Sequence, residues 1–190
     1  MNRNRIIQTA TALFAAYGIK TVDMKRIAKE AYLSEQALEA EFSGMDELLE
    51  TCVQHEIEML KTDISDAVSD SQSSLELLFN AVSTVFAEYS GFCAAFYKDL
   101  REYPAAWNQL NSFREKFHNN CIGYFSDCEK DGFFSSDFLS MESSATFCIE
   151  TFGSMEYKYQ AKMMRIFLQS ISTKKGIREI RRIDSERIFL

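Results

Sequence analysis

The residues that could carry acid–base, nucleophilic or metal chemistry are scattered along this 190-residue chain. Its two histidines, His55 and His118, lie far apart, and its five cysteines are odd in number and have no paired metal-ligand spacing. The sequence has no glycine-rich phosphate loop, nucleophile elbow or HExxH pattern. We therefore expect no catalytic residues, no metal site and no cofactor. We expect the cysteines to be reduced core thiols, with redox sensing by one of them as the alternative.

Carboxylate side chains are concentrated instead in one short acidic segment. Glu35, Glu39 and Glu41 lie there, and no lysine or arginine occurs between Ser34 and Phe42. A carboxylate accepts hydrogen bonds and repels other anions. The segment is therefore either a solvated helix face or a surface that accepts hydrogen bonds from a partner.

Three amphipathic helices are expected to position this segment. Apolar residues at helical spacing predict a first helix that ends at Gly18, where a left-handed C-cap is easiest: Ile6, Ala10, Leu13, Phe14 and Tyr17. Thr21 or Asp23 can cap a short second helix, and Ser34 can cap a short third one. Two short helices joined by a tight turn after a longer helix form a helix-turn-helix.

The order and spacing of these residues resemble the DNA-binding head of the TetR/AcrR family of bacterial transcriptional regulators. The resemblance is carried by Ile7, Ala10, Leu13, Phe14, Gly18, Thr21, Ile27, Ala28, Ala31, Ser34, Leu38, Phe42, Glu47 and Leu48. An unrelated amphipathic three-helix bundle is the alternative. The resemblance implies a helix-turn-helix head on residues 1–46 and a ligand-binding, dimerising body on residues 47–190.

Three residues depart from the family's pattern. Tyr32 stands in the turn where family members usually have glycine, so it must adopt a positive φ, at a cost of about 1 kcal/mol or more, or force a different turn. Glu39 and Met45 stand where family members usually have a tyrosine and a lysine that hold DNA phosphates. The head therefore lacks two common phosphate contacts.

The head also lacks a basic surface. Residues 1–50 contain six Lys and Arg against eight Asp and Glu, a net charge of −2. Because phosphate neutralisation supplies most non-specific affinity for DNA, we expect weak binding. Arg3 and Arg5 can reach a groove as an N-terminal arm, and Lys25 and Arg26 are placed for backbone contact. The glutamates stay among the candidates, because a glutamate can accept a hydrogen bond from cytosine N4. The predicted DNA contacts are Arg3, Arg5, Thr21, Lys25, Arg26, Ser34, Glu35, Gln36, Ala37, Glu39 and Met45.

The rest of the chain predicts helices only. Ser43 followed by Asp46 resembles a capping box at the start of a long fourth helix. Pro104, the only proline, fits the first turn of a helix that carries the longest aromatic stripe. The expected helices cover approximately residues 45–68, 75–86, 92–100, 104–132, 139–153 and 155–172.

Residues 98–117 and 131–138 also resemble the body of TetR-family proteins. In the family, the fifth to eighth helices enclose an effector cavity, so the resemblance implies a small-molecule site. The aromatic residues of this part of the chain favour an apolar or aromatic ligand. The predicted ligand residues are Phe96, Trp107, Asn111, Phe113, Phe117, His118, Cys121 and Phe147, with Asn111 and His118 as polar anchors. An ordinary hydrophobic core is the alternative for any one of these aromatic residues.

The last two of these helices are predicted to form a homodimer interface. In the family, the equivalent pair meets its copy in a four-helix bundle. The predicted interface residues are Phe152, Tyr159, Met163, Ile166 and Phe167, which otherwise would complete the monomer core. Residues 173–187 carry a net charge of +3 and are expected to form a surface appendage, an extra helix or a nucleic-acid contact.

Composition agrees with a folded protein. Hydrophobic residues make up 46% of the chain and aromatic residues 13%, while the net charge is −7. No apolar stretch is long enough to span a membrane, so a cytoplasmic protein without a membrane partner is expected. The sequence thus predicts an all-α, TetR-like transcriptional regulator that binds operator DNA under the control of a small-molecule effector. The alternative is a TetR-fold protein that has lost DNA binding and acts as a ligand sensor or protein-partner module.

Overall fold

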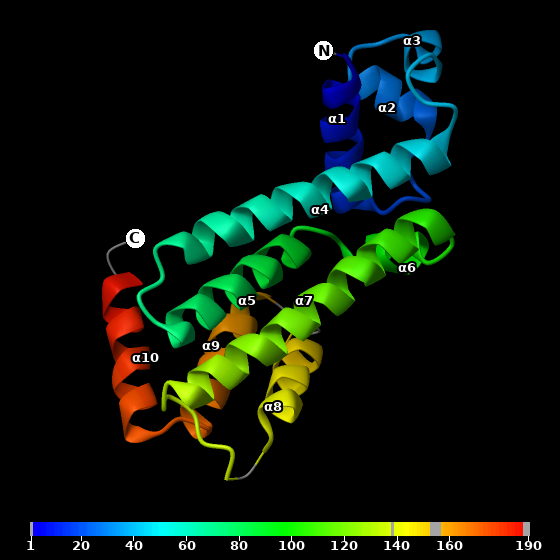
Figure 1. Cartoon of the computed structure of the whole chain (residues 1–190). Helices are drawn as coiled ribbons and strands as arrows, with labels where there is room; N and C mark the ends of the chain where they lie inside the picture. The colour runs from blue at the N-terminus through cyan, green and yellow to red at the C-terminus, as the bar shows by residue number, and fades with distance from the viewer. Residues whose placement is uncertain (1, 138, 153–156, 188–190) are drawn as a thin grey trace. The chain divides into compact units, whose positions relative to one another are not determined.

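The computed structural model describes residues 2–137, 139–152 and 157–187 (Figure 1). The expected all-α fold is confirmed, because the described residues form helices and turns apart from an isolated antiparallel bridge between Phe134 and Ser172. The helices are α1 (Asn2–Tyr17), α2 (Met24–Glu30), α3 (Glu35–Glu39), α4 (Met45–Ser69), α5 (Ser74–Ser90), α6 (Ala94–Leu100), α7 (Pro104–Lys130), α8 (Met141–Phe147), the π-helical turn η1 (Cys148–Phe152), α9 (Tyr157–Ser170) and α10 (Lys174–Arg187).

The chain forms two compact units. The first comprises Met1–Leu60 and Gly91–Arg114, and the second comprises Lys61–Ser90 and Glu115–Leu190. Both α4 and α7 therefore contribute residues to both units. This division by packing places α6 with the first unit, so it differs from the boundary expected near residue 46. That boundary, between a DNA-binding head and a ligand-binding body, stays a prediction about function.

Caps explain where the helices of the first unit begin. Asp23 caps α2 by accepting a hydrogen bond from the backbone N–H of Arg26 at 2.7 Å, so Asp23 and not Thr21 is the cap. The predicted pairing of Ser43 with Asp46 is wrong. Glu47 accepts from both the backbone N–H and the hydroxyl of Ser43 at 2.8 Å, because α4 begins at Met45 and its third residue is the one that reaches back.

Helix α6 is fastened to the end of α1. The backbone N–H of Cys93 donates to the carbonyl of Ala15 at 2.9 Å, and the Asp99 carboxylate accepts from the backbone N–H of Lys20 at 3.0 Å. Gly18, between these contacts, has a φ of +80°, and a Cβ there would lie 2.9 Å from the Cβ of Ala95. Glycine is thus required at residue 18 by both conformation and space.

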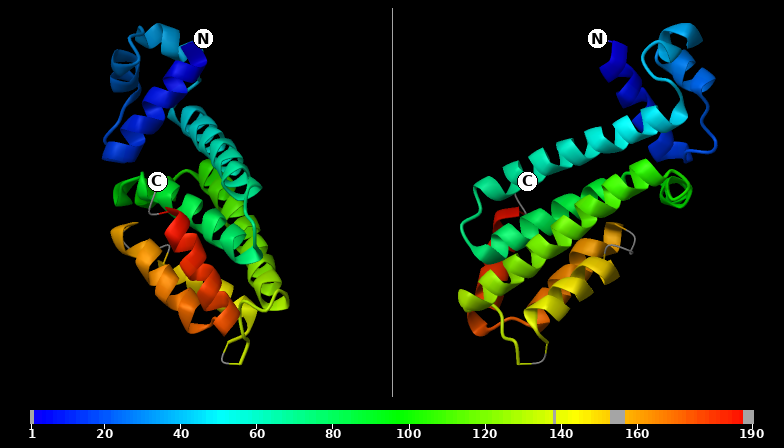
Figure 2. Two further views of the ribbon diagram at one scale, coloured as in Figure 1. Left: turned by 90° about the vertical axis from the view of Figure 1, so that its left-hand side faces the viewer. Right: turned by 45° about the vertical axis from the view of Figure 1, so that its right-hand side comes forward.

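In the second unit, α5 packs against α9 and α10. Figure 2 shows α10 running beside α9. The extra helix expected for residues 173–187 is present as α10, which buries Ile180 and Ile183. Helix α8 begins two residues later than expected, because Ser140 caps it by accepting from the N–H of Ser143 at 3.1 Å. Its regular α-helix ends at Phe147, where the π-helical turn η1 follows.

Candidate nucleic-acid interface

Helix α3 holds a polar face at the surface of the first unit. The hydroxyl of Ser34 accepts from the backbone N–H of Ala37 at 3.1 Å and so begins the helix, while Leu38 is fully buried and anchors it. Ala37 is half-buried. The exposed side chains of the helix are Glu35, Gln36 and Glu39. Glu35 and Glu39 therefore lie on a solvent-facing helix surface, whereas Glu41 lies in the turn after α3 and is half-buried. What that surface contacts stays a prediction.

Tyr32 closes the turn between α2 and α3 in the positive-φ conformation, with φ at 55°. The N–H of Leu33 donates to the carbonyl of Ala28 at 2.9 Å, and the N–H of Tyr32 donates to that of Lys29 at 3.1 Å. These two bonds form a Schellman motif, which usually has glycine at the residue that Tyr32 occupies. The turn geometry is thus retained without glycine.

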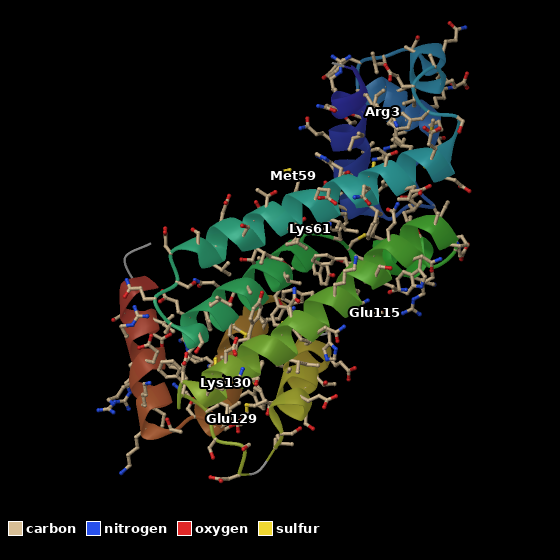
Figure 3. The ribbon with its side chains drawn as sticks, viewed as in Figure 1. Arg3, Met59, Lys61, Glu115, Glu129 and Lys130 are labelled. Carbon is tan, nitrogen blue, oxygen red and sulfur yellow. The ribbon has the colours of Figure 1, made fainter. Side chains whose placement is uncertain are left out.

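Arg3 lies against the end of the helix-turn-helix (Figure 3). Its guanidinium donates to the carbonyl of Glu41 at 2.6 Å, lies 3.6 Å from the Glu47 carboxylate and stacks 4.1 Å from the centre of the Phe42 ring. Because α1 begins at Asn2, the segment expected to act as an N-terminal arm is helical, and Arg3 and Arg5 lie in the first turn of α1. A DNA contact by either arginine stays a prediction.

The other cations of the head fall into two groups. Arg26 stacks over the Tyr17 ring at 4.2 Å, and the Lys20 ammonium lies 2.6 Å from Glu102. Arg5, Lys25 and Lys29 are exposed. Lys29 was not among the predicted contacts, although its spacing of four from Lys25 indicates the same face of α2.

Two further predicted contacts have local structural roles. The Thr21 hydroxyl donates to the carbonyl of Tyr17 at 2.8 Å, which closes the end of α1. Met45 is half-buried at the start of α4. Beside it, the pKa of the Glu47 carboxyl lies below its ordinary value, first because the backbone N–H of Ser43 donates to it and then because the Ser43 hydroxyl does so. The start of α4 thus carries a fixed negative charge, which helix N-termini favour.

The predicted ligand residues divide between the two units. Phe96, Trp107, Asn111 and Phe113 belong to the first unit, and Phe117, His118, Cys121 and Phe147 to the second. In the first, both phenylalanines are buried, and Trp107 and Asn111 are half-buried. These residues are placed as core and core-edge side chains, and a ligand contact by any of them stays a prediction.

In the second unit, Phe147 departs from the expected cavity, whereas His118 makes a polar contact with a neighbouring helix. The Nε2 atom of His118 lies 3.0 Å from the Thr146 hydroxyl. Phe147 is 45% exposed and its ring centre lies 5.0 Å from that of Phe167. Because its neighbour Cys148 takes the buried side of the helix, Phe147 lies with the predicted dimer residues and not in the interior with Cys121.

A small cavity in the second unit has a volume of about 10 Å³, which is room for about one water molecule. None of the predicted ligand residues lines it. Its walls are Leu75, Phe79, Arg165, Leu168, Ile180, Ile183 and Asp184. A small-molecule effector is larger than one water molecule and would therefore need a different or an enlarged site.

Burial disfavours the thiolate form of several cysteines. It raises the pKa of Cys52, Cys121 and Cys128 to about 12 and raises that of Cys148 as well. Because the thiolate is the reactive form, these residues suit a structural role.

Helix α9 presents an apolar face to solvent. Tyr159 and Ile166 are each 50% exposed, Met163 is also exposed and Phe167 is half-buried. Spacings of four and three place Tyr159, Met163 and Ile166 on one face. These three side chains therefore do not complete the monomer core. The side chain of Phe152, also predicted for the interface, lies outside the described residues.

In the described part of the chain, no helix is long and apolar enough to cross a membrane.

Comparison with known proteins agrees with the geometry of the head. Residues 6–52 match the family model described as bacterial regulatory proteins, tetR family. No curated protein matches the sequence.

Solved structures extend the likeness to most of the chain. The ketosteroid transcriptional regulator KstR2 of Mycobacterium tuberculosis is 17% identical, with a TM-score of 0.69 over 92% of this chain and 96% of that one. A protein described as a transcriptional regulator from Saccharomonospora viridis, solved with choline, is 15% identical, with a TM-score of 0.79 over 90% and 98%. A TetR-family transcriptional regulator from Streptomyces coelicolor is 19% identical, with a TM-score of 0.69 over 95% and 94%.

At these identities the solved structures show the fold, and the family model adds the sequence relationship of the head. Residues 6–52 thus match the tetR family of bacterial regulatory proteins, and the chain that carries them has the fold of TetR-family transcriptional regulators.

Proposed function

We propose that this protein is a transcriptional regulator that binds operator DNA in the cytoplasm through α2 and α3, under the control of a small-molecule effector. The observation that carries the proposal is the intact helix-turn-helix. The Schellman motif at Tyr32 forms the turn between α2 and α3, and the polar face of α3 is exposed. The match of residues 6–52 to the tetR family supports it. The proposal assigns no catalytic activity to the chain.

Phosphate contact is assigned to α2. Lys25 and Lys29 are exposed and lie one turn apart, about 6 Å along the helix axis. The first helix of a helix-turn-helix crosses the DNA backbone while the second enters the major groove. With so few available cations and with acidic side chains on α3, binding should be weak and its salt dependence shallow.

A homodimer is part of the proposal. A two-fold dimer places two heads on successive major grooves, roughly 34–36 Å apart. The exposed face of α9, with the Phe147–Phe167 ring pair beside it, is an apolar surface suited to such an interface.

Effector control is supported by the fold and by the regulator from Saccharomonospora viridis, which was solved with choline. In the second unit, the polar pair of His118 and Thr146 comes from α7 and α8, and Phe117 and Cys121 are buried near His118 in the sequence of α7. This combination of apolar and polar groups is typical of a small-molecule site. Compounds that change the DNA-bound fraction in the assay below would identify effectors.

The test compares the wild type with the double variant Glu39→Tyr, Met45→Lys. Mobility shifts are measured on operator-like and random duplexes at low salt and again at moderate salt. We expect weak wild-type binding with a shallow salt slope, and stronger binding of the double variant to all sequences alike, because a carboxylate is removed and a cation is added near the backbone. Tight, selective wild-type binding that the double change leaves untouched would contradict this account of α3.

A second function is favoured by the acidic face itself. The exposed carboxylates of Glu35 and Glu39, together with Tyr32 at 88% exposure in the preceding turn, offer a surface suited to a basic protein partner. In that case the head has retained its helix-turn-helix fold and lost DNA binding. Absence of wild-type binding at low salt, restored by the double change, would support this second function.

A further inference from the structure

The solvent-facing side of α3 carries hydrogen-bonding groups on a short, well-anchored helix. Glu35 and Gln36 lie in its first turn, directly after the Ser34 cap, and Glu39 lies one turn beyond Glu35 on the same line. Leu38 is fully buried, so the helix has a fixed rotation about its axis. The position of each exposed group is therefore set by the core of the head.

The carboxylates on this face are not neutralised within the head. Among the described residues, no ion pair involves Glu35 or Glu39. Arg3 is held by Glu41, Phe42 and Glu47, and Lys20 is paired with Glu102. The acceptor oxygens of Glu35 are thus free to take a hydrogen bond from outside the protein.

Base chemistry limits what these oxygens can contact. An ionised carboxylate only accepts hydrogen bonds. In the major groove, cytosine N4 and adenine N6 donate, whereas guanine and thymine present oxygen acceptors that repel a carboxylate. Cytosine is the usual partner of a glutamate, and an amide such as that of Gln36 matches the N6 and N7 atoms of adenine.

We propose that Glu35 determines operator specificity by accepting a hydrogen bond from cytosine N4, with Gln36 contacting an adenine next to it. This inference rests on the proposed DNA-binding function. The N-terminal residues of a recognition helix contact base edges. Glu35 lies at that end of α3 and is the candidate for a base contact, whereas Glu39 lies at the other end. Specificity thus comes from α3, while Lys25 and Lys29 of α2 supply sequence-independent phosphate contact.

The test is a selection from random DNA duplexes at low salt with the full chain. The variants are Glu35→Gln and its matched control Glu39→Gln, which makes the same change of charge on the same helix. The wild type should enrich cytosine at one position of each half-site. Glu35→Gln should weaken the cytosine preference there by about 5- to 150-fold, the range expected for losing one good base contact. Glu39→Gln should raise affinity for all duplexes and keep the preference.

Different outcomes separate this inference from the function on which it rests. If the wild type selects DNA but Glu35→Gln selects the same sequences, the inference fails and DNA binding stands. The same holds if guanine or thymine is required at that position. If neither the wild type nor either variant selects any duplex while circular dichroism shows all three folded, the inference and the proposed function fail together.

Discussion

Tyr32 illustrates how one residue can keep a turn at an energetic cost. Its φ of 55° lies in the left-handed region, where an L-residue costs roughly 1–2 kcal/mol. The ring is 88% exposed, so burial offsets little of that cost. The conformation persists because the hydrogen bonds from Tyr32 and Leu33 to the last turn of α2 require it.

We expect Tyr32→Gly to raise the free energy of unfolding by about 0.5–1 kcal/mol. Relief of the left-handed strain should exceed the roughly 0.5–1 kcal/mol that glycine loses in conformational entropy. Tyr32→Ala is the control, because it removes the ring and keeps the Cβ, and it should change stability little. Urea unfolding followed by circular dichroism measures both. Equal stabilities of the two variants would show that the backbone is not strained at residue 32.

At the level of elements, one ion pair, between Arg182 and Glu76, joins α10 to α5, and neighbouring polar groups support it. The Arg182 guanidinium lies 2.6 Å from Glu76 and 2.7 Å from Glu179, and the Ser73 hydroxyl donates to Glu179 at 2.6 Å. The two carboxylates are largely buried, with side chains 15% and 17% exposed. Arg182 is thus the cation between two carboxylates from different helices.

We expect Arg182→Met to lower the free energy of unfolding by about 1–3 kcal/mol at pH 7, because charged hydrogen bonds are lost and two carboxylates are left near each other. Arg178→Met is the matched control. Arg178 is exposed on the same helix and forms no ion pair among the described residues, so its loss should cost little.

The effect of Arg182→Met should depend on pH. The hydrogen bond from Arg182, and then that from Ser73, lowers the pKa of Glu179 below its ordinary value of 4.5. A lowered pKa in the folded state contributes stability that is fully present above about pH 4.5 and is lost as the pH falls through the folded value. The difference between the wild type and Arg182→Met should therefore shrink below pH 4.5. A difference that stays constant in acid would mean that packing, and not charge, explains it.

For the whole molecule, we expect the apolar face of α9 to determine the oligomeric state. We expect a homodimer that buries more than about 1,000 Å², because a monomer would leave Tyr159, Met163 and Ile166 exposed to water. Ile166→Glu should shift the equilibrium towards monomer or aggregate. Ala161→Glu is the control, since Ala161 is exposed on α9 but its spacing of two from both Tyr159 and Met163 places it off that face. Sedimentation equilibrium at micromolar concentration gives the masses, and a monomeric wild type would rule out this interface.

The helices of this protein and several of their caps could be predicted from local sequence. Apolar spacing predicted α1, α5 and α7, and Ser34 was expected to cap α3, as it does. These features are local because a helix and its cap involve residues only three or four apart. The same locality explains the error at α4, where a helix start displaced by one residue exchanges Asp46 for Glu47 as the residue that reaches back.

What the sequence by itself determined is an all-α chain with a helix-turn-helix head and an acidic third helix, because periodicity, caps and charge are properties of short segments. Only the tertiary structure decided that Arg3 is held by Glu41, Phe42 and Glu47, and that Phe147 meets Phe167 and not the interior. Those partners are 20 to 44 residues away in sequence. Which side of a helix meets which neighbour depends on packing between distant segments, and no spacing within one segment encodes it.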